Sequence, residues 1–473
     1  MVPVTHVGVI DIGKTNAKVA VVALESRTEI GVLKRPNAVR PGPPYPHYDV
    51  DGLWRFICDS LAELHLAHRI DAISVTTHGA SIVLLDAEGG LAAPVLDYEC
   101  DGPDRLTADY DAIRPDFLET GSPRLSMGLN VGAQLFWQFR SDPGLCARVA
   151  AVLTYPQYWA FRLTGQRACE VTSLGCHTDL WNPHLQCFSP LVERLGLSGK
   201  MAPLRMAADC AGTLLPEIAR RAGLPEGLTV ACGIHDSNAS LYPHLLKRKA
   251  PFSVVSTGTW VIALSIGGKA FALDPARDTL INVNAFGDPV PSARFMGGRE
   301  FDLLMGGRMG GQPGTCAETE AARVLGERIL LLPAVDPLSG PFQGRQSRWS
   351  EDETGLSDGE RFTAVSFYLA LMTAECLAIT GAMGPVIVEG PFARNALYLQ
   401  MLETATGRPV TASEGSATGT SIGAALLVGD DTRPPDKGSA PAVAQSGTLR
   451  SFPADPAFQA YADAWQRQVH GGR

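Results

Sequence analysis

The chain has 473 residues, of which 45% are hydrophobic, and a formal net charge of −9 at pH 7. A chain of this length usually forms two or three domains, and its apolar content is sufficient for a sizeable core. Because the net charge is negative and the charged residues are dispersed, the composition argues against a nucleic-acid-binding surface and against an anionic-membrane surface.

The cysteines are spread as ten single residues without a C-x-x-C motif. The closest pair, Cys169 and Cys176, lacks the spacing of zinc ligands. This pattern indicates reduced thiols and predicts a cytoplasmic protein. We expect neither a signal peptide nor a membrane span, because no run of eighteen apolar residues occurs and a strand-like stretch begins close to Met1.

The first element is an apolar stretch that begins at Val7 and reads VGVIDIGKTNAKVAVV. Residues 8–15 satisfy the G-x-x-x-x-G-K-[ST] pattern of a Walker phosphate loop, which requires a flexible turn followed by a helix. Here strand-forming residues lie between the glycines, and 16–22 have the composition of a returning strand. A β-hairpin is therefore the better interpretation, with a Walker NTPase as the weaker alternative. Its tight turn carries Asp11, Gly13, Lys14, Thr15 and Asn16.

Strands and helical stretches alternate after this hairpin. We expect a buried strand over 72–77 that ends at His78, and then a second hairpin formed by 81–85 and 93–96. Helical spacing is predicted over 131–140 and 156–163. A later strand over 228–234 runs directly into His235 and Asp236, where a helix is expected to begin.

The opening pattern returns at 252–264, which reads FSVVSTGTWVIAL. Aligning Gly13 with Gly258 places Lys14 opposite Thr259. The two copies lie too far apart for a solenoid repeat. The repetition therefore predicts two related domains that each begin with a phosphate-facing hairpin, although two unrelated hairpins would give the same pattern.

The second half of the chain continues the alternation of strands and helices. A strand is expected over 385–389, a helix over 394–406, and a helix packed through small residues over 419–427. The segment from about residue 430 to 447 is rich in Pro, Gly, Ser and Ala. It predicts a mobile linker to a short C-terminal helix.

The two hairpin turns could bind a polyphosphate if they faced one cleft. Glycine permits close approach of the backbone N–H groups, while Lys14, Thr15 and Thr259 supply further donors. The phosphates would repel Asp11 unless a cation intervened. We therefore expect Asp11 to bind Mg²⁺ through water, since Mg²⁺ takes few carboxylates and keeps part of its hydration shell.

Asp236 is the predicted general base. An aspartate at a strand-to-helix junction is often only an N-cap. Phosphoryl transfer, however, needs one carboxylate placed to accept the proton of the attacking hydroxyl, and Asp236 follows a strand of the same domain as Asp11.

Sugar recognition is predicted for His78, Asp97 and Glu99, because an imidazole and a cluster of carboxylates suit hydroxyl groups. The alternatives are a packed structural histidine and a solvated acidic loop.

With these residues in place, the chain resembles the FGGY family of carbohydrate kinases over most of its length, from Val7 to about Leu427. The matching motifs are D-I-G-K-T at 11–15, T-H-G at 77–79, G-I-H-D-S-N-A at 233–239, S-T-G-T at 256–259, V-E-G at 388–390 and G-A-A at 423–425. Two departures concern binding residues. The family's W-x-D-x-R sugar motif is replaced by L-D-Y-E-C-D at 96–101, and the G-G of the adenosine region is Gly390-Pro391.

The resemblance implies an α/β, two-domain actin-like (ribonuclease H-like) fold with a cleft between the domains. It implies an N-terminal domain over 1–247, which binds the sugar and carries the catalytic aspartate. A nucleotide-binding domain would span 248–430, and a linker and C-terminal tail 431–473. Gly390 and Asn395 are the contacts expected in the adenosine region.

The resemblance also implies ATP-dependent phosphorylation of a sugar, with Mg²⁺ as cofactor and a homodimer as assembly. The pocket is closest to deoxyketose kinases of the fuculose and rhamnulose type. An actin-like ATPase without a sugar substrate is the alternative from another class.

Overall fold

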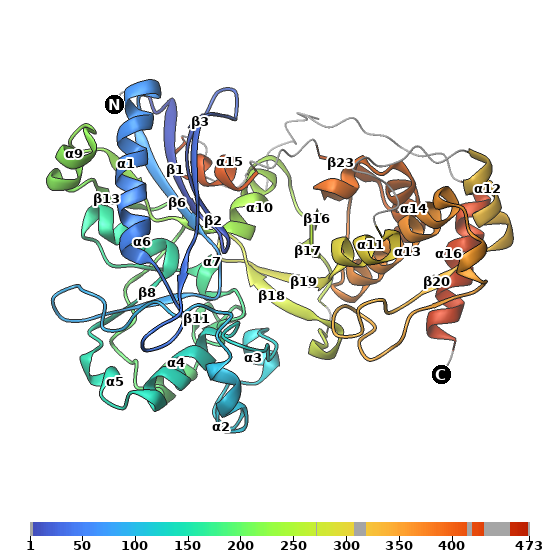
Figure 1. The fold of residues 1–473 in the computed structure, drawn as a ribbon, viewed down its shortest axis with the longest axis horizontal. Helices are drawn as coiled ribbons and strands as arrows, with labels where there is room; N and C mark the ends of the chain where they lie inside the picture. Colours follow the sequence, from blue (N-terminus) through green and yellow to red (C-terminus); the bar gives the residue numbers. More distant parts are fainter. Residues whose placement is uncertain (1–2, 271, 307–317, 414–418, 430–454, 472–473) are drawn as a thin grey trace. The chain divides into compact units, whose positions relative to one another are not determined.

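The computed structural model describes residues 3–270, 272–306, 318–413, 419–429 and 455–471. These residues form two compact units (Figure 1). The described part of the first unit consists of 3–247, 281–289 and 419–429. The remaining described residues form the second unit. The predicted linker after residue 430 lies outside the described residues.

A seven-stranded sheet forms the centre of the first unit. Its strand order is β13-β14-β6-β1-β2-β3, and β15 also pairs with β6. The pairs β1–β2 and β2–β3 are antiparallel, while β6 is parallel to β1, β14 and β15. The strands are β1 (His6–Ile12), β2 (Asn16–Ala23), β3 (Thr28–Pro36), β6 (Ala72–Thr77), β13 (Cys210–Thr213), β14 (Thr229–Ala231) and β15 (Ile234–His235).

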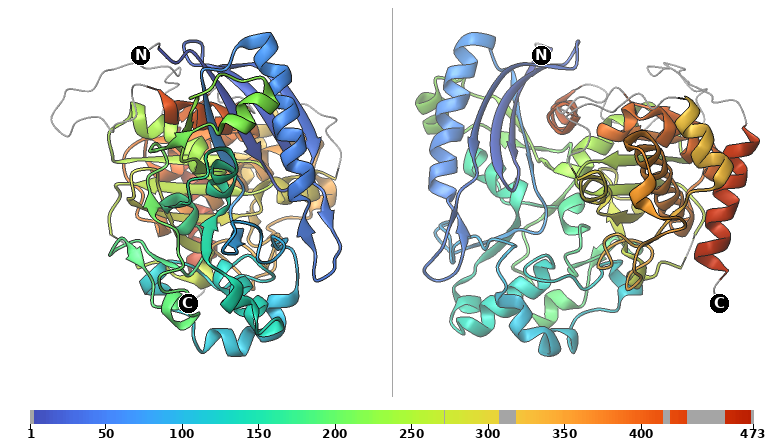
Figure 2. Two further views of the ribbon diagram at one scale, coloured as in Figure 1. Left: turned by 90° about the vertical axis from the view of Figure 1, so that its left-hand side faces the viewer. Right: turned by 45° about the vertical axis from the view of Figure 1, so that its right-hand side comes forward.

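Helices cover both faces of this sheet. α1 (Val50–His68) packs on one face (Figures 1 and 2), where Trp54 stacks on Trp159 of α6 (Tyr155–Thr164). This face also carries α9 (Pro216–Ala222), which contacts α1. α10 (Asp236–Lys247) and α15 (Gly419–Ala425) pack together on the other face. α15 contacts β1, β2 and β6 directly.

The other elements of the first unit are short. They are β4 (Val39–Arg40), β5 (His47–Tyr48), β7 (Ile82–Leu85), η1 (Gly102–Leu106), α2 (Thr107–Asp111), α3 (Phe117–Thr120), α4 (Val131–Ser141), α5 (Leu145–Arg148), β8 (Ala151–Thr154), β9 (Cys169–Glu170), α7 (Val171–Leu174), β10 (Trp181–Asn182), β11 (Cys187–Phe188), α8 (Leu191–Arg194), β12 (Leu204–Arg205) and η5 (Leu426–Val428).

The sheet of the second unit repeats this arrangement. Its order includes β19-β17-β16-β22-β23, in which β17 is antiparallel to β16 and β19, and β22 is parallel to β16 and β23. The hairpin β16–β17 thus occupies the place that β1–β2 has in the first sheet, so the repetition seen in the sequence extends to strand order. The strands are β16 (Phe252–Thr257), β17 (Val261–Ile266), β18 (Thr279–Val283), β19 (Pro289–Phe295), β22 (Val386–Glu389) and β23 (Val410–Ala412).

α13 (Asp358–Ile379) is the core helix of the second unit. Among the described helices it alone is long and apolar enough to cross a membrane, but 94% of its most apolar window is buried inside the protein. α14 (Ala396–Thr406) packs beside it, and α16 (Pro456–His470) packs on α14. The other elements are η2 (Pro275–Arg277), α11 (Gly297–Met305), α12 (Glu318–Glu327), β20 (Leu331–Leu332), β21 (Arg348–Trp349), η3 (Glu353–Gly355) and η4 (Pro391–Arg394).

Most predicted elements are confirmed, and one hairpin is formed only in part. Residues 81–85 do form β7, and a turn follows at 86–90, where the Asp86 N–H donates to the Gly90 carbonyl at 2.9 Å. Beyond the turn, Leu91 pairs with Leu85 and the Ala92 N–H donates to the Leu84 carbonyl at 2.8 Å, but the strand partner of β7 along its length is β8 and not 93–96. The local pattern identified the turn, but the turn does not reveal β8, which begins at Ala151, 66 residues after Leu85, and is brought to β7 by tertiary packing.

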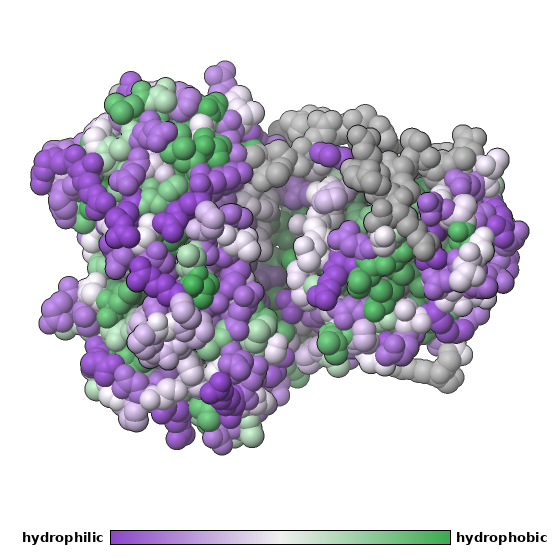
Figure 3. Space-filling view, in the orientation of Figure 1, coloured by the Kyte–Doolittle hydropathy of each residue, from purple (hydrophilic) through white to green (hydrophobic). Residues whose placement is uncertain are grey.

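On the face shown in Figure 3, hydrophilic residues cover most of the first unit, and a hydrophobic patch is visible on the second. The described cysteines form no disulfide bond.

Candidate functional site

Polar residues follow three neighbouring strands of the first unit. Thr77, at the end of β6, is paired with Ile12 of β1 on one side and His235 of β15 on the other. Because the three strands are parallel, their carboxyl ends lie at one edge of the sheet, the edge where open α/β sheets bind ligands. The residues that follow these ends are Gly13, His78 and Asp236.

The backbone before Asp236 is held by specific contacts. Gly233 has a φ of +97°, and a Cβ there would lie 2.8 Å from the Val75 carbonyl oxygen, so this position requires glycine. Gln157 Nε2 donates to the Gly233 carbonyl at 3.0 Å. The His235 N–H donates to Thr172 Oγ1, also at 3.0 Å. These contacts fix where α10 begins and therefore where the Asp236 side chain starts.

Asp236 is the first residue of α10, and its side chain is 34% exposed. Its Oδ1 accepts a hydrogen bond from the Ser237 N–H at 2.6 Å and lies 3.1 Å from His235 Nε2. Burial raises the pKa of Asp236, and the neighbouring His78 lowers it. Burial lowers the pKa of His235 to about 4, so this imidazole is neutral near pH 7.

His78 is buried among three tyrosines, Tyr48, Tyr98 and Tyr155, which we call the tyrosine cluster. Its ring centroid lies 5.1 Å from those of Tyr48 and Tyr155 and 5.4 Å from that of Tyr98. Nδ1 lies 2.8 Å from the Gly79 carbonyl oxygen, which can only accept, so Nδ1 carries the proton.

The other ring nitrogen of His78 is therefore an acceptor. Nε2 is buried and has no hydrogen-bond partner within the described part of the chain. Burial lowers the pKa of His78 to about 4, so the ring stays neutral near pH 7. A buried acceptor without a donor is unfavourable, and a ligand hydroxyl would satisfy it.

Lys14 lies with the predicted sugar-binding carboxylates. Its Nζ forms an ion pair with Asp97 and lies 3.1 Å from Glu99 Oε2. The same atom lies 4.7 Å from the ring centroid of Tyr98, within cation–π range. Tyr48 donates its hydroxyl hydrogen to Asp97 at 3.1 Å. Asp97 and Glu99 thus engage the charge of Lys14 in this structure, and its contact with ATP stays a prediction.

Asp11 is paired with a lysine that the sequence reasoning missed. Lys18 Nζ lies 3.2 Å from Asp11 Oδ2 and 2.9 Å from Glu29 Oε1. Burial raises the pKa of Asp11, Lys18 lowers it, and the charge of Asp236 raises it. Lys18 could have been found from the hairpin register, because Asp11 and Lys18 are directly opposite across β1 and β2.

The carboxylates of Asp11 and Asp236 suit a Mg²⁺ ion that also binds a substrate phosphate better than a metal ion held only by protein side chains. Asp11 and Asp236 are close enough for the charge of one to raise the pKa of the other, and a cation would relieve that repulsion. Among the described residues no group of three or more His, Cys, Asp and Glu side chains could hold a metal ion. Mg²⁺ needs only one or two carboxylates when a substrate phosphate supplies the other ligands.

The first hairpin turn is fixed by hydrogen bonds. The Gly13 N–H donates to the Asn16 carbonyl at 2.9 Å, and Asn37 Nδ2 donates to the Gly13 carbonyl at 2.8 Å. The Asn37 N–H also donates to the Thr15 carbonyl. Thr15 and Asn16 are exposed at the tip. Asn37 was not predicted, because nothing local distinguishes it from any loop asparagine.

The corresponding turn of the second unit carries Gly258 and Thr259, which are both exposed. The Gly258 N–H donates to the Trp260 carbonyl at 2.9 Å. Gly298, in the first turn of α11, packs so closely that a Cβ would lie 2.1 Å from the Gly258 carbonyl oxygen. The Gly-Gly pair at 297–298 was the available sequence signal for this contact, and it was missed.

Gly390 follows β22 and approaches the end of β16, the first strand of this hairpin. Asn395 directly precedes α14. Gly390 has a φ of +84°, and a Cβ would lie 1.9 Å from the Thr257 carbonyl oxygen, so Pro391 follows a required glycine. Asn395 caps α14 by accepting from the Tyr398 N–H at 3.2 Å, and its Nδ2 donates to Ser366 at 2.8 Å. These bonds account for Asn395 as a structural residue, and contact with ATP stays a prediction.

Two family models match the chain. "FGGY family of carbohydrate kinases, N-terminal domain" matches residues 6–242, and "Carbohydrate kinase FGGY, C-terminal domain" matches residues 249–436. The chain belongs to the FGGY family of carbohydrate kinases. An L-fuculokinase from Salmonella typhi is 27% identical to this FGGY chain over 269 residues, which are 55% of the chain and 56% of the relative. The matched region is thus little more than half of either protein.

Solved structures extend the likeness over the whole FGGY chain. A carbohydrate kinase from Novosphingobium aromaticivorans is 33% identical, with a TM-score of 0.88 and full coverage of both chains. A xylulose kinase from Rhodospirillum rubrum is 20% identical, with a TM-score of 0.75 over 98% of each chain, a likeness that concerns the fold alone. The two-domain α/β fold expected from the sequence is confirmed.

Proposed function

We propose that this protein is an ATP-dependent carbohydrate kinase that phosphorylates a hydroxyl group of a ketose. The observation that carries the proposal is the presence, at one edge of the sheet, of Asp236 and of a neutral His78 whose Nε2 is a buried, unsatisfied acceptor. Such a site suits a polyhydroxylated substrate, since one hydroxyl can be oriented by His78 while another gives its proton to a carboxylate.

Asp236 acts as the general base. It accepts the proton of the attacking sugar hydroxyl, the hydroxyl oxygen forms a bond to the γ-phosphorus, and the bond between that phosphorus and ADP breaks. The Ser237 N–H holds the carboxylate in place through its hydrogen bond to Oδ1. The ordered backbone that precedes Asp236 keeps this geometry before the substrate arrives, which reduces the entropy lost on binding.

The two hairpin turns contact the phosphates of ATP in this proposal, with Gly13, Thr15 and Asn16 on one turn and Gly258 and Thr259 on the other, while the Gly13 and Gly258 N–H groups stay in the hydrogen bonds of their own turns. Gly390 permits the close approach of the loop after β22. Asp11 holds Mg²⁺, which when bound neutralises charge on the phosphates. Lys14 joins Asp97 and Glu99 in recognising substrate hydroxyls and keeps those carboxylates neutralised.

In this proposal the substrate is a ketose such as L-fuculose, L-rhamnulose or a related sugar. The support is the 27% identity to an L-fuculokinase over half of the chain. The same proposal includes a cytoplasmic location, which suits both this chemistry and cysteines without disulfide bonds. It also includes a homodimer.

The deciding experiment measures ADP release with MgATP and a panel of L-fuculose, L-rhamnulose, L-xylulose, D-xylulose, glycerol and aldoses. Wild type is compared with Asp236→Asn and with Asp109→Asn, an exposed aspartate that serves as the control. We expect stimulation by one or a few ketoses, a loss of roughly 10²–10⁴-fold in kcat for Asp236→Asn and wild-type activity for the control.

Two results would contradict the proposal. ATP turnover that no sugar stimulates, and that Asp236→Asn retains, would favour an actin-like ATPase. Sugar phosphorylation at the wild-type rate in Asp236→Asn would keep the kinase but remove the assigned base. A calorimetric titration with ATP should show that Asp236→Asn still binds nucleotide, since Asp236 is not a phosphate ligand.

A further inference from the structure

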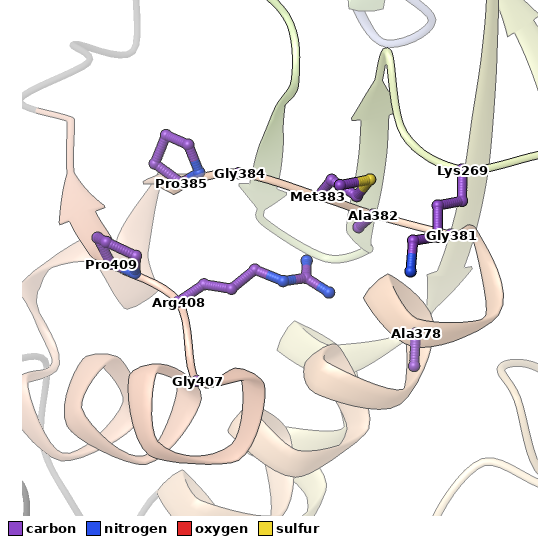
Figure 4. Close-up of a pocket in the computed structure, with 10 residues that line it drawn as sticks. All are labelled: Lys269, Ala378, Gly381, Ala382, Met383, Gly384, Pro385, Gly407, Arg408 and Pro409. Atoms are coloured by element: carbon purple, nitrogen blue, oxygen red, sulfur yellow. The ribbon is translucent and has the colours of Figure 1, made fainter.

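A hollow of about 600 Å³ lies within the second unit (Figure 4). Its walls are the last turn of α13, the loop that leads to β22 and the connection from α14 to β23. It therefore lies at the amino end of β22, while Gly390 follows the carboxyl end of the same strand. The lining residues are Lys269, Ala378, Gly381, Ala382, Met383, Gly384, Pro385, Gly407, Arg408 and Pro409.

Two cations point into this hollow, and none of its lining residues carries a carboxylate. Figure 4 shows Arg408 reaching across it from the α14–β23 connection and Lys269 reaching in from the opposite side. The remaining lining side chains are small or apolar. The hollow thus combines positive charge with an otherwise apolar wall.

The charge of Arg408 is not compensated by the protein. Its Nη1 is buried and has no hydrogen-bond partner within the described residues, where the guanidinium forms no ion pair either. Burial lowers the pKa of Arg408, and no carboxylate offsets this effect. The C-terminus of α13 contributes roughly half a negative charge, less than the charge of the two cations.

The walls of the hollow are fixed by backbone contacts. The Lys269 N–H donates to the Gly381 carbonyl, the Ser253 N–H to the Pro385 carbonyl, and the Val386 N–H to the Pro409 carbonyl, each at 2.9 Å. Lys269, Pro385 and Pro409 therefore keep their places without a ligand, and a ligand would enter a site that is largely preformed.

We propose that this hollow binds a phosphate monoester of a small, mostly apolar molecule between Arg408 and Lys269. Two facing cations match the near-double negative charge of a phosphate monoester at neutral pH better than the single charge of a carboxylate. A guanidinium can give a phosphate two parallel hydrogen bonds, which would satisfy Nη1. The apolar wall would contact the organic part of the ligand. This proposal does not depend on the proposed function.

The test titrates phenyl phosphate into the full chain by calorimetry. Wild type is compared with Arg408→Gln, with Lys269→Gln and with Arg467→Gln, whose arginine is exposed on α16 outside the hollow. We expect wild type and Arg467→Gln to bind equally and each of the other variants to bind on the order of tenfold more weakly. Benzoate, a monoanion with the same ring, should bind wild type more weakly than phenyl phosphate does.

Three results would overturn the proposal. The first is equal affinity for phenyl phosphate in all four proteins, which would place the ligand elsewhere. The second is absence of binding to wild type. The third is binding of benzoate as tight as that of phenyl phosphate. Melting curves check that each variant is folded. Lys269 is exposed, so Lys269→Gln decides the question if Arg408→Gln does not fold.

Discussion

At the scale of single residues, the polar groups at the edge of the first sheet divide into satisfied and unsatisfied ones. The Asp11 carboxylate is paired with Lys18, and the Asp97 carboxylate with Lys14 and Tyr48. His78 Nε2 has no partner among the described residues. The satisfied groups are held in place, and the unsatisfied one is the point at which a ligand would gain most.

Glu170 supports this edge of the sheet through hydrogen bonds that lead to His235. Its Oε2 accepts from Thr172 Oγ1 at 2.5 Å and from the Ser173 N–H at 3.2 Å, and Thr172 Oγ1 in turn accepts from the His235 N–H. Glu170 is fully buried, and burial raises its pKa from 4.5 to about 7. Its protonation state therefore changes near neutral pH, unlike that of an exposed glutamate.

The pKa of Glu170 makes stability depend on pH. Between about pH 4.5 and 7 the unfolded chain releases this proton while the folded protein keeps it, so this contribution to stability is lost as pH rises. We expect wild type to lose up to about 3 kcal/mol relative to Glu170→Gln across that window. Melting temperatures of both proteins over this range measure the effect. Parallel curves would contradict it, and Glu226→Gln, an exposed site, is the control.

The residue types at the site were predictable, but their partners were not. Asp236 and His78 were identified because each follows an apolar strand, and Asp11 because the sequence placed it at the hairpin turn, whereas the structure has it within β1. The tyrosine cluster, Asn37 and the Glu170–Thr172 pair come from distant segments, and no local pattern marks them. Only the tertiary structure shows which polar groups already have partners, because that depends on side chains brought together by the fold.

At the scale of elements, the crossing of α10 and α15 positions the helix that begins with Asp236. Gly423 of α15 packs so closely that a Cβ would lie 1.7 Å from the Ala239 carbonyl oxygen of α10. Of the small residues seen in the sequence at 419–425, Gly423 is therefore explained by the close approach of a neighbouring backbone. A rigid carbonyl cannot move away as a flexible side chain can.

We expect Gly423→Ala to destabilise the first unit by about 1–3 kcal/mol and to lower kcat, because α10 must shift. Gly419→Ala is the matched control on the same helix, since its Cβ would meet only Ser240 Oγ, at 4.0 Å. Urea unfolding and steady-state kinetics of the two variants provide the test. If Gly423→Ala were as stable and as active as Gly419→Ala, the packing argument would be wrong.

At the scale of the whole molecule, the C-terminal helix belongs to the core of the second unit. The sequence grouped it with a tail over 431–473. In the structure Trp465 and Tyr461 of α16 are buried, and they donate to the carbonyls of Leu331 at 2.8 Å and Ile329 at 2.8 Å. These contacts join the end of the chain to residues far earlier in the sequence.

Trp465→Ala should therefore cost about 3–5 kcal/mol of stability, as expected for a large buried aromatic residue. Arg467→Ala, on the exposed side of the same helix, should change stability little. Thermal unfolding followed by circular dichroism compares the two variants with wild type. An unchanged transition in Trp465→Ala would show that α16 does not contribute to the core.

The sequence by itself determined the local structures and their repetition. Apolar runs with glycine turns between them indicated the hairpins β1–β2 and β16–β17, and helical spacing indicated α4 and α6. These patterns depend on neighbouring residues, which a single sequence displays directly. The tertiary structure decided the rest: the pairing of β7 with β8, the engagement of Lys14 by Asp97 and Glu99, and the hollow around Arg408. Each of these joins segments that are distant in sequence, and their contacts follow from packing that no local pattern encodes.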